Sequence, residues 1–308
     1  MPKKNSKQIY HDVTSHFIAA MKDGAPPWVK PWDENKFCAD LPVNAVSGRK
    51  YSGVNITILW TAAASHGFKR DRWLTFNQAK SVGGAVRRGQ KGTIAVLFKN
   101  VGSPARRKEI DRQSASEDKE EREGQFRLIR GFTLFNVEQC NDLPKDVKKG
   151  LEPRKCTPGW QLHKKADDLL LKQNIKIHRD NKSACYVPSK DKIYMPAKSA
   201  FDSTAGYYST LFHELAHWTG HCSRLNRPGI NSSTDIESAE YAFEELIAEI
   251  CSAFLCAEFG IPGEQRHDSY ILSWIEKLEN DPKAIFSASA QAWKARSFVL
   301  GESPDLDS

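Results

Sequence analysis

The chain has 308 residues, of which 40% are hydrophobic and 27% are charged, and its formal net charge is +7. That length suffices for one large or two ordinary domains with a buried core, and the composition excludes a disordered chain. No apolar run approaches the roughly 18 residues that span a bilayer, and the N-terminus has no apolar signal segment. The seven cysteines are an odd number and contain no C-x-x-C pair, so we expect a cytoplasmic protein with reduced thiols and no membrane partner.

The charge is distributed unevenly along the chain. Residues 1–150 hold 27 Lys and Arg against 16 Asp and Glu, whereas residues 151–308 hold 18 against 22. A basic front half and a mildly acidic back half indicate two domains with different partners. The front one favours a polyanion.

The front half begins with an amphipathic pattern over residues 7–22, which predicts a helix that ends at Gly24. The following stretch APPWVKPWD (25–33) holds three prolines and is expected to be an irregular loop. NAVSGRKYSG (44–53) predicts a turn or hairpin, and residues 54–67 predict an apolar helix ended by Gly67.

A short helix is predicted from Thr75, and it breaks at a pair of glycines before a basic turn that ends near residue 92. Two β-rich runs follow, at 93–101 and 126–139. Between them, residues 102–125 carry six positive and seven negative charges and a single large apolar residue. We expect this stretch to be a mobile loop, because it cannot bury enough surface to offset the entropy of ordering.

Basic residues alternate with aromatic ones in the front half, a pattern typical of single-strand binding. Phosphates attract Lys and Arg, and exposed bases stack on aromatic rings. No helix–turn–helix, zinc-finger or RRM signature is present. The candidate DNA-binding residues are Trp28, Lys30, Trp32, Arg49, Lys50, Tyr51, Arg70, Arg72, Trp73, Arg87, Arg88 and Lys91. For each aromatic residue, burial in the core is the competing interpretation.

The back half carries the motif HELAH at residues 213–217, within a segment of helical periodicity that ends at Gly220. His213 and His217 lie one turn apart on one helix face, where two imidazoles can hold one metal ion. Glu214 is then placed beside the metal and is the candidate catalytic base. We expect Zn2+, with another divalent ion such as Mn2+ as the alternative.

A third ligand is sought in the helix predicted over residues 237–260. Glu245 is the candidate ligand and Glu249, one turn further on, is the candidate partner of a histidine N–H. Glu244 competes with Glu245, because a rotation of the helix would bring it to the same place.

The H-E-x-x-H-x-x-G-x-x-H pattern is not completed. Gly220 fits it, but Ser223 stands where the last histidine belongs, and His221 comes two residues early. A glutamate-type site is therefore favoured.

Residues 185–196 predict two strands about a Ser-Lys-Asp turn, and the second, KIYMP (192–196), is the candidate edge strand for a bound peptide. A Tyr or His that steadies the oxyanion is expected, and the sequence does not choose between the candidates Tyr194, Tyr207, Tyr208 and Tyr241.

Taken together, these stretches resemble the ArdC-type antirestriction proteins of conjugative plasmids. The similarity in the front half lies in PPWVKPW (26–32), NAVSGRKYSGVN (44–55), RWLTFNQAK (72–80), GGAVRRGQKGT (83–93) and FTLFNVEQ (132–139). In the back half it lies in HELAHWTGHCSRLNR (213–227) and YAFEELIAE (241–249).

The resemblance implies an α+β chain of two domains. A small basic single-stranded-DNA-binding domain (1–145) precedes a zincin-like, gluzincin-type metallopeptidase domain (155–308). It also implies protection of incoming conjugative DNA from host restriction, with a protein substrate linked to restriction or DNA processing. Similar front domains occur in plasmid primases. The alternative is a non-catalytic DNA-binding protein whose metal site is structural. A metal-dependent nuclease is less favoured, because the multiple-Asp two-metal pattern is missing.

Overall fold

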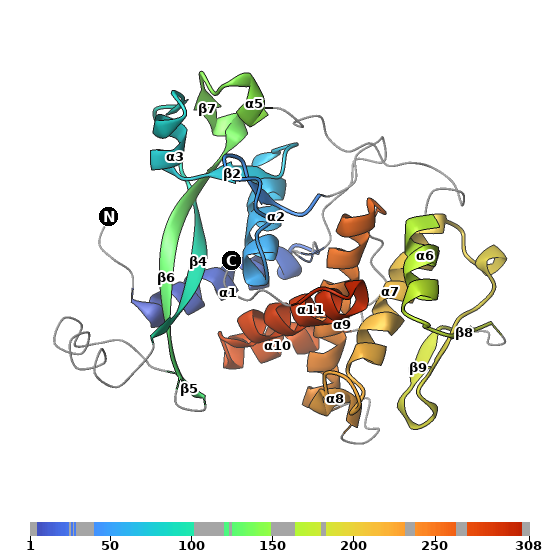
Figure 1. Cartoon of the computed structure of the whole chain (residues 1–308). Helices are drawn as coiled ribbons and strands as arrows, with labels where there is room; N and C mark the ends of the chain where they lie inside the picture. Colours follow the sequence, from blue (N-terminus) through green and yellow to red (C-terminus); the bar gives the residue numbers. More distant parts are fainter. Residues whose placement is uncertain are drawn as a thin grey trace.

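The structure is a computed structural model of the whole chain (Figure 1). The residues that it describes are 5–24, 26, 28, 40–101, 120–122, 125–148, 164–179, 183–231, 238–262 and 270–303. Lys30, Trp32 and most of the charged stretch 102–125 lie outside the described residues. So does the boundary that we expect between the two domains.

The front domain is built on a twisted sheet with the order β1-β2-β6-β4. Its long hairpin pairs β4 (Thr93–Val101) with β6 (Gln125–Asn136) in antiparallel register from Thr93↔Leu134 to Val101↔Phe126. The short strands β1 (Val43–Asn44) and β2 (Arg72–Leu74) extend it on one side, and β5 (Glu120–Arg122) pairs with the end of β6. The predicted β-rich runs are thereby confirmed.

Among the residues described here, three helices lie beside this sheet, and each begins or ends where the sequence predicts. α1 (Ser6–Lys22) buries its apolar stripe, and α2 (Val54–His66) ends at Gly67 with a left-handed φ of 68°. α3 (Phe76–Ser81) starts from a capping box between Thr75 and Gln78. β7 (Cys140–Asn141) follows η1 (Val137–Gln139) and pairs with β3 (Ala85–Val86) in a small sheet, and α5 (Lys145–Lys148) ends this part.

The back domain begins with α6 (Lys164–Lys172) and a three-stranded sheet in the order β8-β10-β9. These strands are β8 (Ile177–His178), β9 (Cys185–Val187) and β10 (Lys192–Tyr194), and the turns η3 (Pro188–Lys190) and η4 (Lys198–Ala200) accompany them. The prediction that residues 192–196 form an edge strand is wrong. β8 pairs in parallel with the free side of β10 and leaves β9 at the edge.

Five helices complete the described part of the back domain: α7 (Thr204–Thr219), α8 (Pro228–Asn231), α9 (Ala239–Phe259), α10 (Ile271–Asn280) and α11 (Ala284–Leu300). α9 is the central one and packs against the other four. A buried hydrogen bond of 2.8 Å from Ser252 Oγ to the Ser209 carbonyl joins α9 to α7 and fixes their relative height. Among the described residues, no helix is both long and apolar enough to cross a membrane.

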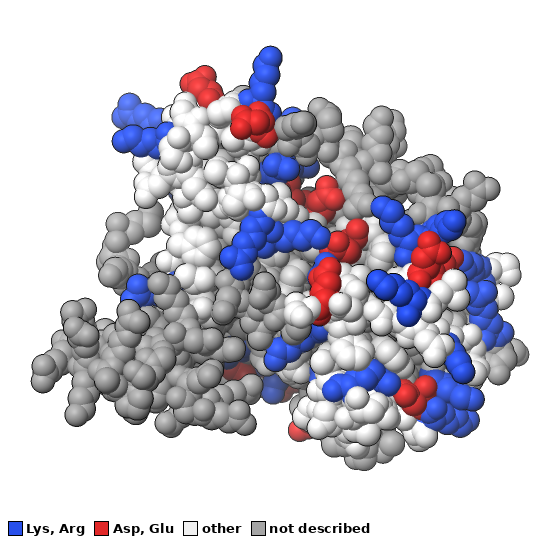
Figure 2. All heavy atoms as spheres, viewed as in Figure 1, with Lys and Arg blue, Asp and Glu red and all other residues white. Residues whose placement is uncertain are grey.

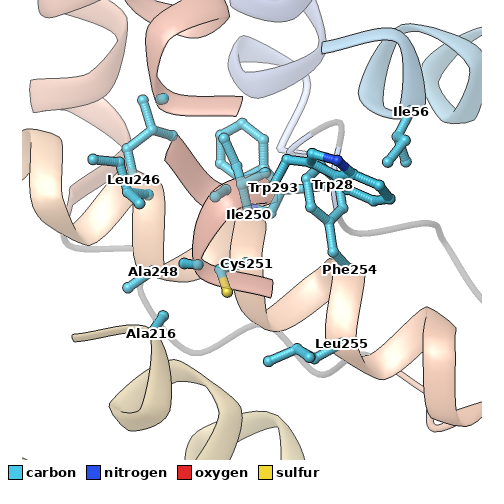
Figure 3. Close-up of a cluster of buried hydrophobic side chains, with 14 of the residues drawn as sticks. Trp28, Ile56, Ala216, Leu246, Ala248, Ile250, Cys251, Phe254, Leu255 and Trp293 are labelled. Carbon is cyan, nitrogen blue, oxygen red and sulfur yellow. The ribbon is translucent and has the colours of Figure 1, made fainter. Parts of the chain in front are cut away.

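The two domains share one continuous hydrophobic core. Trp28 and Ile56 from the front half lie beside Ile250, Phe254 and Trp293 from the back half (Figure 3). Aromatic pairs cross the same boundary, with ring centroids 4.7 Å apart for Tyr10–Phe286, 5.5 Å for Trp28–Trp274 and 5.9 Å for Trp60–Phe254. The front domain is thus packed directly against α9, α10 and α11.

Candidate metal centre

The helix α7 brings two imidazoles together on its buried side. His213 and His217 are 5% and 6% exposed, and their Nε2 atoms lie 3.0 Å apart. Ser203 caps the start of the helix, and Leu211 and Leu215 anchor another face in the core. The four-residue spacing places both rings on one side, as expected from the helical period.

Glu245 reaches the same point from α9. Its Oε2 lies 3.2 Å from His213 Nε2 and its Oε1 lies 3.3 Å from His217 Nε2. Ligands held about 2.0–2.1 Å from a tetrahedral metal ion are themselves about 3.3 Å apart, so these three donors fit one ion without rearrangement. Two imidazoles and one carboxylate are also a donor set that suits Zn2+ and Mn2+.

The outward-facing ring nitrogens have carboxylate partners of their own. His213 Nδ1 lies 3.2 Å from Glu249 Oε1, and His217 Nδ1 lies 3.2 Å from Glu244 Oε1. Such partners select the tautomer that leaves Nε2 available for a metal. Glu244, the competitor for the third ligand, therefore lies on the far side of His217 from Glu245.

Glu244 is in turn held by Arg227, a buried residue for which sequence analysis found no role. Its Nε and Nη2 donate to the two carboxylate oxygens at 2.8 and 2.6 Å, its Nη1 donates to Thr219 Oγ1 at 2.8 Å, and its Nη2 donates to the Ala216 carbonyl at 2.6 Å. Gly220 makes room for this guanidinium, since a Cβ there would lie 2.9 Å from Nη2. No local pattern marks Arg227, because its partner comes from a distant helix.

The carboxylates control the protonation of the histidines. Burial alone would lower the pKa of both rings, but Glu245 together with Glu249 raises the pKa of His213 well above its usual value. For His217, Glu245 and Glu244 outweigh burial and raise the pKa to about 9. Burial would raise the pKa of Glu245, but the two rings lower it. The cluster therefore has a high affinity for protons, and a metal ion that binds at Nε2 would have to displace them.

A cleft of about 710 Å³ opens onto this centre. Its lining combines His213, Glu214, His217 and Glu245 with the edge strand β9 and its following turn. Glu214, 8% exposed, projects into the cleft from the turn of α7 that carries both histidines. The sequence-predicted catalytic residue and the three candidate ligands therefore meet in one cavity.

Two tyrosines also face the cleft. The Tyr241 hydroxyl is hydrogen-bonded to Glu245, and burial followed by the charge of that carboxylate raises its pKa. Tyr270, which sequence analysis missed, is hydrogen-bonded to Tyr241. Tyr207 and Tyr208 are fully buried elsewhere, and Tyr194 does not line the cleft. Of the four candidates, Tyr241 is the one beside the reactive groups.

The edge strand β9 is fastened to the loop after α7 by Arg224. The guanidinium donates from Nη1 to Asp191 Oδ2 at 3.0 Å, donates again from Nη2 to Asp191 Oδ1, and reaches the Tyr186 hydroxyl at 3.3 Å. It also stacks over the Trp218 ring, 4.0 Å from its centroid. This clamp fixes one wall of the cleft relative to the histidines.

The front-half candidates divide into buried and exposed groups. Trp73 is fully buried, and Trp28 and Tyr51 are 3% and 8% exposed. The prediction that these three rings stack on bases is therefore wrong, because each already packs inside the protein. Lys50 is exposed, and its ammonium lies 2.7 Å from Glu258 of α9.

The remaining cations stay at the surface. Arg49, Arg87, Arg88 and Lys91 are exposed, whereas Arg70 and Arg72 are half-buried. Among the predicted DNA-binding residues, the described cations are therefore fully or partly exposed, whereas the described aromatic residues are buried in the core.

Comparison with known proteins agrees with this architecture. Residues 7–135 match the family described as the N-terminal domain of anti-restriction factor ArdC, and residues 164–291 match the family of zincin-like metallopeptidases. The ArdC protein of plasmid R388 has the same fold. Its metal-free crystal structure superposes with a TM-score of 0.75 at 34% identity, over 94% of this chain and 96% of that one. Its Mn(II)-bound structure gives a TM-score of 0.73 at 33% identity, over 96% and 98%.

Curated relatives include y4eC of Sinorhizobium fredii, 33% identical over 96% of this chain and 93% of its own length. Two Escherichia coli proteins named DNA primase TraC are 37% and 35% identical over 96% of this chain. The chain spans only 27% and 20% of their lengths. A zincin-like domain implies zinc, and the R388 structure shows that a relative binds manganese. With both family regions matched in order and the fold shared along nearly its whole length, the chain belongs to the ArdC antirestriction family.

Proposed function

We propose that this protein binds single-stranded DNA through its basic front domain and hydrolyses a protein substrate in the cleft of its back domain. In this way it protects incoming conjugative DNA from the restriction enzymes of the recipient cell. The observation that carries the proposal is the meeting of His213, His217 and Glu245 in one cleft that also holds Glu214. The ArdC relatives and the plasmid-borne setting of the R388 protein support the biological role.

The chain's own residues have separate tasks in this reaction. His213, His217 and Glu245 hold the metal ion, while Glu249 and Glu244 keep the two rings in the tautomer that donates from Nδ1. The edge strand β9 binds the peptide in extended form by adding it to the sheet. Zn2+, when bound, supplies Lewis-acid polarisation of the scissile carbonyl and acidifies a water molecule.

Glu214 is the general base. Its carboxylate accepts the proton of the attacking water and delivers it to the leaving amine nitrogen, which becomes the new N-terminus as the C–N bond breaks. The Tyr241 hydroxyl, which donates to Glu245 in this structure, turns its proton to the oxygen that gains negative charge once Glu245 holds the metal ion. No other acid is needed within the cleft, because one proton moves from water to amine.

The decisive variant is Glu214→Gln, which keeps the size of the side chain and removes the base. We expect it to retain metal content and oligonucleotide binding and to lose at least about 100-fold in hydrolysis of a denatured casein probe. Glu240→Gln, in the first turn of α9, is the matched control. Plasmid transfer into a restricting recipient then measures protection.

Loss of protection with Glu214→Gln supports a peptidase in antirestriction. Full protection by the same variant would show that the metal site is structural and that the protein acts by occupying DNA. For the front domain, affinity for a labelled single strand should fall steeply with salt, because each phosphate contact releases counterions. A flat salt response would contradict the proposed DNA binding.

A further inference from the structure

The burial of Trp28, Tyr51 and Trp73 raises the question of which ring in the front domain a base can reach. Among the described residues, Phe76 is the most exposed large aromatic side chain, at 56%. It is the first residue of α3, directly after the capping residue Thr75. Because more than half of its surface is in water, the Phe76 ring lacks the stabilisation that burial in the core would provide.

The exposure of Phe76 follows from a rigid backbone. Thr75 and Gln78 form a reciprocal capping box that fixes the start of α3, and the buried Ala79 anchors the helix in the core. Lys80 lies one turn after Phe76 and is also exposed. The outward face of this helix therefore offers an aromatic ring with a cation beside it.

The turn over residues 44–49 lies alongside this helix. Asn44 donates from Nδ2 to Gln78 Oε1 at 3.1 Å, and the Ala45 amide donates to the Trp73 carbonyl at 2.8 Å. Asn44 Oδ1 also accepts from the amides at 46 and 47, which shapes the turn. The turn displays Val46, 40% exposed, together with the exposed Arg49. The turn with its apolar Val46 and cationic Arg49 is thus joined to the first turn of α3 through Asn44 and Gln78.

The segments that form this patch are rich in cations. Residues 41–101 contain ten Lys and Arg and a single acidic residue, Asp71, which is only 9% exposed. In the view of Figure 2, Lys and Arg side chains lie at the upper left, where α3 lies in Figure 1, and acidic side chains lie beside them at the top. A flat apolar ring within a positive surface matches a ligand that combines phosphates with aromatic faces.

We infer that Phe76, with Lys80, Val46 and Arg49, forms the base-stacking part of a single-stranded DNA site, which we term the α3 patch. The inference rests on the proposed DNA binding and specifies where the bases lie. The phosphates follow the cations and one base stacks on the Phe76 ring. A duplex does not fit this arrangement, because its base faces are already stacked.

The test is fluorescence anisotropy with a labelled 16-nucleotide oligothymidine and the full-length protein. Phe76→Ala is expected to weaken binding about 5- to 100-fold, the range for loss of one stacking contact, without changing the salt dependence. Phe76→Tyr should bind within about twofold of the wild type, because it keeps the π-face. Phe298→Ala, which truncates an exposed phenylalanine of α11, is the control and should have no effect.

A strand of the same length with abasic sites separates stacking from charge. On this probe the wild type and Phe76→Ala should bind equally, since no base is present to stack. Equal binding of both proteins to oligothymidine, or the same loss on the abasic strand, would overturn the α3 patch while leaving the proposed DNA binding intact. Failure of the wild type to bind either strand would overturn the proposed DNA binding itself and the patch with it.

Discussion

Replacing Arg227 by Met should destabilise the protein strongly even in the absence of metal. Arg227 is 3% exposed and donates four hydrogen bonds, two of them to Glu244, which is 1% exposed. Removing the guanidinium leaves that carboxylate buried without its main partner. Breaking a buried pair in this way costs about 3–5 kcal/mol of unfolding free energy. Methionine keeps most of the volume, so a cavity adds little.

The measurement is urea unfolding in EDTA, which removes any contribution from bound metal. Arg87→Met, at an exposed arginine, is the control and should change stability by less than about 0.5 kcal/mol. Adding Glu244→Gln to Arg227→Met should recover part of the loss, because the buried charge disappears with its partner. A loss below about 1 kcal/mol for Arg227→Met, or strict additivity in the double variant, would refute the reasoning.

Two further predictions concern the cleft. Chelation by EDTA should lower the melting temperature. Adding Mn2+ or Zn2+ at about 100 times Kd should restore about 2.7 kcal/mol of unfolding free energy. Glu245→Gln should abolish this gain, and a full gain in that variant would exclude Glu245 as a ligand. The hydrogen bond from Arg224 holds the pKa of Asp191 below its ordinary value of 3.8. The ion pair between these two residues therefore stabilises the fold above pH 3.8. Its contribution is lost as the pH falls through the lowered pKa. Asp191→Asn should therefore cost about 0.5–1 kcal/mol at pH 7 and progressively less on acidification, as measured by urea unfolding from pH 7 to 2.5; a cost that grows on acidification would contradict this.

The sequence predicted the features that depend on local periodicity. The apolar stripe of α1, the Gly67 end of α2 and the His213–His217 pair all follow from the 3.6-residue repeat and from the left-handed conformation that glycine tolerates. These were confirmed because neighbouring residues alone decide them.

The features that depend on packing between distant segments were not predictable. Glu244 and Glu245 differ by a rotation of about 100° on α9, and only the contact with α7 decides which one reaches Nε2. Trp73 stands between a basic residue and a leucine in the sequence, a setting that suits either a core or a binding surface. The edge position of β9 follows from the two-residue strand β8, which is too short to leave a pattern.

The shared core has a consequence for how this protein is divided in the laboratory and in evolution. Separating the halves would hydrate the cross-boundary faces of Tyr10, Trp28 and Trp60 and strip Phe254 and Phe286 of their neighbours. Neither half expressed alone would then represent the full-length protein. The effects of a truncation would reflect misfolding rather than the loss of catalytic or DNA-binding residues. The much longer TraC proteins agree, since the similarity extends over both halves together. The two halves together therefore form the unit that is inherited.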